Sequence, residues 1–248
     1  AGAALATVAS PIVSILMCGT HFLRKDSTVK VKICAPSVKR LWHSCQLGVS
    51  AFVGEISSGV ITATFNFLVL GIAGNVGVAS YGVVANYALV AVAMFNGVSL
   101  GAQPLVSRYY GQGDQRSVKQ ILKLGRMTAL VLAVVLIGAV YGFTEELTQI
   151  FNSENSKQLA EYAHTGLRLY FIGFLFAGFN IVGAGFLSAT EKAKEAFITS
   201  VLRGFVGIPV CSVLLSALLG LNGVWLAFPA SELITAAVMI FMLRKTKQ

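Results

Sequence analysis

A single carboxylate interrupts one of the longest apolar stretches of this sequence. Residues 47–73, LGVSAFVGEISSGVITATFNFLVLGIA, carry one charge, that of Glu55. At ~1.5 Å of rise per residue, a helix of this length can cross the ~30 Å hydrocarbon core of a bilayer. An ionisable side chain inside such a helix costs about 2.5–3.5 kcal/mol on insertion scales, and its default interpretation is functional. Glu55 is therefore the first candidate for binding a cation or carrying a proton.

Polar side chains continue from Glu55 along one side of the same predicted helix. Ser58, Thr62 and Asn66 follow at spacings that keep them on one face of an α-helix. Such a face can line a substrate cavity. Alternatively, Ser and Thr bond back to the carbonyls of their own helix and Asn66 binds a neighbouring helix.

A second carboxylate, Glu232, lies in the apolar stretch 222–243. Counted inward at ~1.5 Å per residue, Glu55 and Glu232 both fall near the midplane of a bilayer. Two carboxylates in a low dielectric suit a proton carrier or a cation cage, although Glu232 can equally be a hydrogen-bonded acid that locks helices. We assign both as candidate coupling residues, with sodium at Glu55 as the one metal ion considered.

Two further apolar stretches contribute residues that could line a substrate cavity. Asn96 and Gln103 share a helix face in one of them, and Tyr170 and Asn180 lie among several phenylalanines in the other. Aromatic rings can hold large organic cations, although packing is the more common fate of any one ring.

No arrangement typical of an enzyme accompanies these residues. The apolar stretches hold no His paired with Ser or Cys at triad-like positions, and the sequence has no metal-ligand cluster and no Walker motif. The four cysteines lack paired spacing and are read as free thiols. The run Gly111-Gln112-Gly113-Asp114 follows a predicted spanning helix and predicts a turn. We therefore expect no enzymatic activity and no cofactor.

The composition is that of a polytopic membrane protein. Of the 248 residues, 56% are hydrophobic and only 12% are charged, whereas soluble domains carry about 25% charged residues. The net charge of +9 comes from basic residues in predicted connections, where membrane topology requires them. We therefore expect contact with membrane lipid and no nucleic-acid partner.

Seven apolar segments are long enough to cross a membrane, which predicts an all-α protein with seven transmembrane helices. They are residues 1–22, 47–73, 78–105, 124–143, 162–188, 197–219 and 222–243.

The connections between these segments alternate in charge. Those at 23–46, 106–123 and 189–196 and the C-terminal tail are basic, whereas 144–161 holds four Glu against one Lys. The turns near 74–77 and 220–221 carry no charge. The positive-inside rule then places the basic connections and the C-terminus in the cytoplasm and predicts a multi-pass protein of the cytoplasmic (inner) membrane.

The connection 23–46 is the one long linker, and it most simply marks a boundary between helical lobes. After Pro36, the run SVKRLWHSCQ predicts a short amphipathic helix on the membrane surface.

The stretch from Val78 to Asp114 resembles the eighth helix and following cytoplasmic loop of multidrug and toxic compound extrusion (MATE) transporters. The positions that carry this resemblance are Ala79, Tyr81, Asn86, Gly97, Gly101, Gln103, Pro104, Leu105 and Gly111. Shorter runs at 168–171, 183–186 and 223–232 support it. The resemblance extends over essentially the whole chain, with 1–22 similar to the sixth helix of that family and 47–243 similar to helices seven to twelve.

The resemblance implies export of drugs and other small organic cations by antiport with protons or sodium between two six-helix lobes. In these terms, 1–22 is the last helix of a missing N-terminal lobe, 23–46 is the cytoplasmic linker, and 47–248 is the C-terminal lobe. The chain is thus expected to be half of a transporter whose partner is the missing lobe.

The resemblance also bears on the coupling ion. In the sodium-coupled branch of the family, a carboxylate on the seventh helix binds the cation, and Glu55 stands on the matching helix. That branch also has an Asp on the tenth helix, where this sequence offers only the amide of Asn180. The sequence therefore leaves the coupling ion open between a proton and sodium.

Two alternatives for the function are kept. Seven spans also fit a seven-helix receptor, although the sequence shows no Asp-Arg-Tyr or Asn-Pro-x-x-Tyr motif. A flippase for lipid-linked oligosaccharides would need basic residues that face the cavity, and only Arg168 and Arg203 are candidates. We expect both arginines to extend toward the membrane interface instead.

Overall fold

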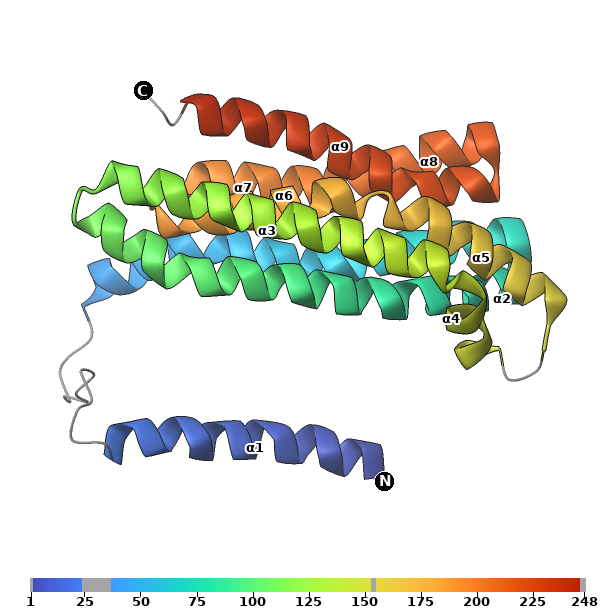
Figure 1. Ribbon diagram of the computed structural model, residues 1–248, viewed down its shortest axis with the longest axis horizontal. Helices are drawn as coiled ribbons and strands as arrows, with labels where there is room; N and C mark the ends of the chain where they lie inside the picture. Colours follow the sequence, from blue (N-terminus) through green and yellow to red (C-terminus); the bar gives the residue numbers. More distant parts are fainter. Residues whose placement is uncertain (1, 24–36, 153–154, 246–248) are drawn as a thin grey trace. The chain divides into compact units, whose positions relative to one another are not determined.

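The computed structural model describes residues 2–23, 37–152 and 155–245, and these form two units that are considered separately, 1–42 and 43–248. The described residues are almost entirely helical and contain no strand, as predicted (Figure 1). The elements are α1 (Gly2–Leu23), α2 (Val38–Gly111), α3 (Gln115–Gly142), α4 (Thr144–Phe151), α5 (Lys157–Phe171), α6 (Phe174–Ala189), α7 (Ala193–Val201), the π-helical turn η1 (Leu202–Gly207), α8 (Ile208–Leu219) and α9 (Leu221–Lys245).

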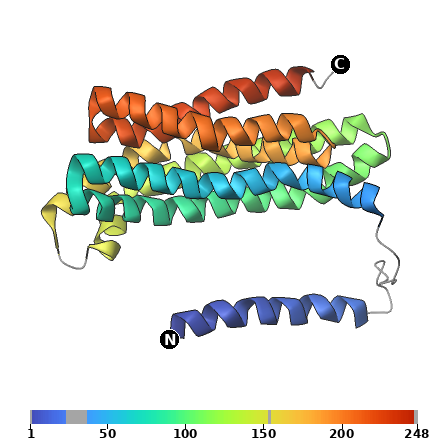
Figure 2. The same ribbon diagram turned by 180° about the vertical axis from the view of Figure 1, so that it is seen from behind.

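Helix α2 is a hairpin of two legs, because its backbone turns at Gly74. This residue has φ 62° and ψ −159°, a conformation that is essentially restricted to glycine. The rings of Phe65 and Tyr81, one on each leg, stack with centroids 5.2 Å apart, whereas a straight helix would separate them by ~24 Å. The turn expected at 74–77 is confirmed, and Figure 2 shows the two legs side by side.

Two of the predicted spans are broken. The segment 162–188, expected as one helix, consists of α5 and α6, which are bent by 48°. The segment 197–219 consists of α7, η1 and α8. Pro209, which follows η1, has no backbone N–H and cannot complete a regular α-helical turn. A wider π-helical turn precedes it.

The predicted number of seven spans is not confirmed. By length and hydropathy, the described residues contain four candidate spans, or five if α5 and α6 together form one. One of these candidates, Phe52–Gly111, includes the Gly74 turn and therefore both legs of the hairpin.

The connections differ in part from the sequence prediction. The acidic connection 144–161 contains a short helix, α4, that we did not expect. Residues 24–36 of the predicted linker lie outside the described residues. The amphipathic run that follows Pro36 forms the first turns of α2 and continues into the next predicted span without a break. Its placement on the membrane surface stays a prediction.

The connections of the second unit are sorted by charge to its two ends. The predicted basic connections 106–123 and 189–196 lie together, because Ser107 Oγ donates a hydrogen bond of 3.3 Å to the carbonyl of Ala189. These connections are mostly helical, since the turns themselves are only residues 112–114 and 190–192, and most of their basic residues lie on the adjoining ends of α2, α3 and α7. The uncharged turns at Gly74 and Gly220 lie at the other end with α4 (Figure 1). This arrangement matches the alternation of charge in the sequence.

The core of the second unit is aromatic, and its outer surface is apolar. The ring of Tyr170 stacks on that of Phe228 with centroids 4.2 Å apart, and Phe174 packs beside both. Trp225 is fully buried, whereas Phe67 and Leu218 are almost 80% exposed. Large exposed apolar side chains on long apolar helices suit a lipid environment.

Candidate functional site

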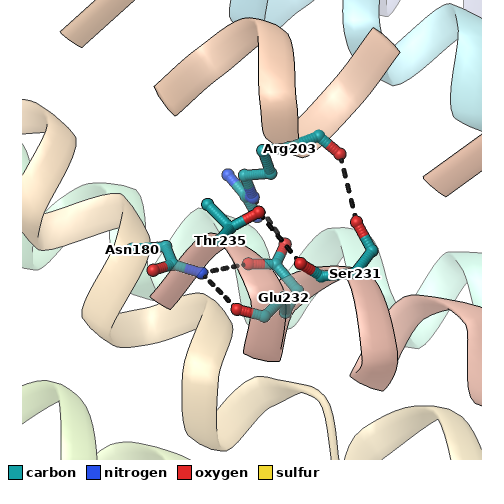
Figure 3. Close-up of polar contacts among 5 residues, drawn as sticks. All are labelled: Asn180, Arg203, Ser231, Glu232 and Thr235. Atoms are coloured by element: carbon teal, nitrogen blue, oxygen red, sulfur yellow. Dashed lines mark hydrogen bonds and ion pairs between the residues drawn. The ribbon is translucent and has the colours of Figure 1, made fainter. Parts of the chain in front are cut away.

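The buried polar site of the bundle is centred on Glu232. This residue lies on α9, and its side chain is completely shielded from solvent. A buried carboxylate is costly unless it is paired and hydrogen-bonded. Its neighbours come from α6 and η1 (Figure 3), and the polar residues shown there define the Glu232 cluster. They are Asn180, Arg203, Ser231, Glu232 and Thr235.

Arg203 of η1 supplies the positive charge. Its Nε donates to Glu232 Oε1 at 2.5 Å, and the arginine side chain is 27% exposed while the carboxylate is fully buried. The charge of Glu232 is thus balanced inside the bundle by a guanidinium that stays partly accessible. The expectation that Arg203 extends only toward the membrane interface is wrong, since a fully buried carboxylate is a better partner than the interface.

Asn180 of α6 satisfies the other carboxylate oxygen. Its Nδ2 donates to Glu232 Oε2 at 2.7 Å and to the Glu232 backbone carbonyl at 2.9 Å. Asn180 is buried, and its Oδ1 has no hydrogen-bond partner among the described residues. The amide therefore ties α6 to α9 and leaves one acceptor free beside the carboxylate.

The hydroxyl groups of the cluster bind backbone carbonyls. Ser231 Oγ donates to the carbonyl of Arg203 at 3.5 Å, and Thr235 Oγ1 donates to the carbonyl of Ser231 at 2.9 Å. Neither hydroxyl donates to the carboxylate. They fix the backbone on which the ion pair rests.

The cluster as it stands is a closed ion pair. Both carboxylate oxygens of Glu232 already accept charged or amide donors. An external cation would have to displace the Arg203 guanidinium before it could bind Glu232.

Glu55 has very different surroundings. Its side chain is exposed on the first leg of α2, and it forms no ion pair within the described part of the chain. Ser58 and Thr62 are also exposed, whereas Asn66 is half-buried and the Thr62 hydroxyl lies within hydrogen-bonding reach of the buried Tyr81. The Glu55 end of this polar face is therefore the part that points away from the core of the unit. Thr62 Oγ1 donates to the carbonyl of Ser58 at 3.0 Å, the local bond that we considered as an alternative.

The other candidate cavity residues are dispersed. Asn96 is exposed on the second leg of α2, and the half-buried Gln103 donates from Nε2 to Ser99 Oγ at 3.4 Å. Tyr170 is packed in the aromatic core. The contacts of Asn180 bring it to Glu232, whereas no hydrogen bond joins Glu55 to Glu232 in the described part of the chain.

The pairing of Arg203 with Glu232 was not predicted from the sequence. A signal was available, because Arg203 and Glu232 are opposite charges in consecutive predicted spans, and the long arginine side chain can reach inward from its own depth. Among the described residues, no group of three or more His, Cys, Asp or Glu side chains is placed to hold a metal ion.

Comparison with known sequences identifies a family and several relatives. A family model described as MatE matches residues 51–213. The multidrug export protein MepA of Staphylococcus saprophyticus is 30% identical over 244 residues, which are 97% of this chain and 53% of that protein. MepA of Staphylococcus aureus is 28% identical over the same shares. The chain thus spans about half the length of the curated relatives it matches.

Comparison with solved structures gives the same fold. An outward-facing multidrug resistance MATE family transporter of the MOP superfamily superposes with a TM-score of 0.90 at 17% identity, over 99% of this chain and 55% of that one. A MOP superfamily transporter from Pyrococcus furiosus superposes with a TM-score of 0.88 at 17% identity, over 99% of this chain and 56% of that one. At this level of identity, the likeness concerns the fold alone.

Proposed function

The chain belongs to the multidrug and toxic compound extrusion (MATE) family of transporters, and we propose on that premise that it is one lobe of a secondary transporter that exports small organic cations. The observation that carries the proposal is the match of nearly the whole chain to relatives named multidrug export proteins. Because the chain covers about half of those relatives, the proposed transporter needs a second, N-terminal lobe as its partner. Residues 1–22 would then belong to that lobe and 23–46 to the linker.

The exposed polar face of α2 supports a water-filled pathway. Glu55 and Ser58 lie on an apolar helix but are exposed at the surface of their own unit. A carboxylate that faced lipid at this depth would be costly. We infer that this face borders a polar cavity between the two lobes, where transporter substrates bind near the midplane.

Glu55 is the proposed coupling carboxylate, which binds a proton or a sodium ion in exchange for substrate. Its exposure leaves it free to bind an ion from water. Glu232 is the second candidate, but only in a state in which Arg203 has left it.

The sorting of charge to the two ends supports an orientation. We propose that the basic connections 106–123 and 189–196 and the C-terminal end of α9 face the cytoplasm, and that the uncharged turns and α4 face the outside. Such an orientation corresponds to a multi-pass protein of the cytoplasmic membrane.

The two alternative functions receive no support. Because the chain belongs to the MATE family of transporters, we no longer consider a seven-helix receptor. The flippase interpretation relied on two arginines, but Arg203 pairs with Glu232, and the Arg168 guanidinium lies over the Tyr141 ring at 5.7 Å from its centroid.

The test is ion-driven export of a cationic dye by the complete two-lobe transporter in vesicles. Glu55→Gln should abolish export under the gradient that drives the wild type, because the amide cannot take up a proton or hold a cation by charge. Glu145→Gln, on the exposed face of α4, is the matched control and should export normally. Unchanged export by Glu55→Gln, with protein amounts equal, would remove Glu55 from the mechanism.

A further inference from the structure

The π-helical turn η1 is wedged between the two helices that carry the candidate carboxylates. Gly204 lies against the side chain of Ser57 on the first leg of α2, and Gly207 lies against that of Ser231 on α9. A Cβ atom at either glycine would collide with the facing serine. The turn therefore fills the available space, and it cannot move toward either helix without displacing it.

The shape of η1 depends on its surroundings. π-Helical turns are rare, and they occur often at functional sites. Pro209 favours a wide turn because it has no N–H to donate. The polar contacts of the turn with α9 are made by Arg203, whose Nε binds Glu232 and whose carbonyl accepts from Ser231. The ion pair is thus the strongest polar link between η1 and α9.

Ser57 connects this turn to the proposed coupling residue. It is 4% exposed because Gly204 covers it, and it follows Glu55 by two residues on the same leg of α2. One continuous set of contacts therefore runs from the buried Glu232 through Arg203 and Gly204 to the part of α2 that bears Glu55.

We propose that Arg203 is a positioning residue, whose ion pair with Glu232 holds η1 against Ser57 and so fixes the leg of α2 that carries Glu55. When the pair is broken, η1 separates from Ser57 while the rest of the hairpin stays packed. The importance of the Arg203–Glu232 pair for ion coupling rests on the proposed function. The contact between η1 and α2 is independent of that function, so it is tested without a transport measurement.

The test uses the accessibility of a cysteine at position 57 in the purified 248-residue chain. The four native cysteines are replaced by alanine, Ser57→Cys is introduced, and the rate of reaction with a water-soluble maleimide is measured. In the otherwise wild-type background this rate should be low. Arg203→Gln and Glu232→Gln should each raise it by at least about tenfold, the factor expected for one lost charge-assisted hydrogen bond.

Two controls separate positioning from general loosening. Ser80→Cys reports on a fully buried site in the second leg of α2, far along the chain from η1, and its rate should not change. Arg203→Lys keeps the charge and should restore slow labelling of Ser57→Cys. The double variant Arg203→Gln/Glu232→Gln buries no unpaired charge, so it retains the fold if the single variants do not, and it should also label quickly.

Three results would overturn the proposal. One is slow labelling of Ser57→Cys in the monodisperse double variant. Another is an equal increase of the labelling rates of Ser57→Cys and Ser80→Cys when the ion pair is broken, which would indicate loss of global packing. The third is labelling of Arg203→Lys as fast as Arg203→Gln. None of these depends on whether Glu55 couples transport.

Discussion

Glu232 illustrates how a charge is kept inside an apolar bundle. Its two carboxylate oxygens accept from Arg203 and Asn180, so neither oxygen is left unsatisfied at full burial. Removing one partner of a buried ion pair typically costs about 3–5 kcal/mol, whereas replacing both can be nearly neutral. Loss of one partner alone is therefore expected to destabilise the bundle more than replacement of both partners together.

At the residue scale, Asp114 makes a pH-dependent contribution outside the membrane spans. The hydrogen bond from the Ser117 hydroxyl, and then the bonds from the backbone N–H groups of Ser117 and Arg116, lower the pKa of the Asp114 carboxyl below its ordinary value of 3.8. A lowered pKa means that the ionised cap stabilises the folded protein above the ordinary pKa. This contribution is lost as the pH falls through the lower, folded value.

We therefore expect Asp114→Ala to reduce the thermal stability of the chain at neutral pH and to have progressively less effect in acid, below pH 3.8. Thermal unfolding of both proteins in detergent, followed by circular dichroism across this pH range, measures the difference. Asp114→Asn retains a capping side chain without the charge and should show a smaller loss at neutral pH. A difference between wild type and Asp114→Ala that is independent of pH would contradict the assignment.

At this scale, the sequence predicted which polar residues are unusual, but it did not predict which residues they contact. Glu232 and Asn180 were identified as unusual polar residues in apolar segments, and both belong to the cluster. The pairing of Arg203 with Glu232 was not predicted, because hydropathy places a residue at a depth but does not say which way its helix is rotated. The exposure of Glu55 depends on the same rotation.

At the scale of elements, long apolar runs predicted the helices, but not their interruptions. The Gly74 turn was expected because the apolar run divides there. The bend between α5 and α6 and the π-helical turn η1 lie inside predicted spans, where a hydropathy averaged over the segment carries no sign of them. Gly173 and Pro209 mark these places, but glycine and proline are common in spanning helices and are not decisive.

The Gly74 turn gives a prediction about the hairpin. Gly74→Ala should destabilise the chain by about 1–3 kcal/mol, because φ 62° with ψ −159° is strained for any residue with a Cβ. Gly71→Ala, three residues earlier, is the control. A Cβ there meets no atom within 4 Å, and alanine in a helix should be neutral or stabilising by about 0.5–1 kcal/mol. Unfolding in mixed detergent micelles compares the two, and equal stabilities would show that the turn tolerates a side chain.

At the scale of the whole molecule, charge alone predicted which connections lie together. The predicted basic connections 106–123 and 189–196 meet at one end of the second unit, and the uncharged turns lie at the other (Figure 1). This agreement arises because successive spanning helices run in opposite directions, so consecutive connections lie at alternate ends of the unit. The charge of the connections then alternates in the same order. The position of Glu55 relative to a second lobe depends instead on an interface that no charge pattern describes.

The proposed two-lobe arrangement makes a final prediction. Alternating access requires two helical bundles that move against each other around a site at their interface. Vesicles that contain only these 248 residues should therefore not export a cationic dye under either a sodium or a proton gradient, even when circular dichroism shows the helical content of a folded chain. The complete transporter should export under one of these gradients, which identifies the coupling ion, and Glu55→Gln serves as its inactive control. Gradient-driven efflux from vesicles with the 248-residue chain alone, sensitive to Glu55→Gln, would show that one lobe suffices and would refute the arrangement.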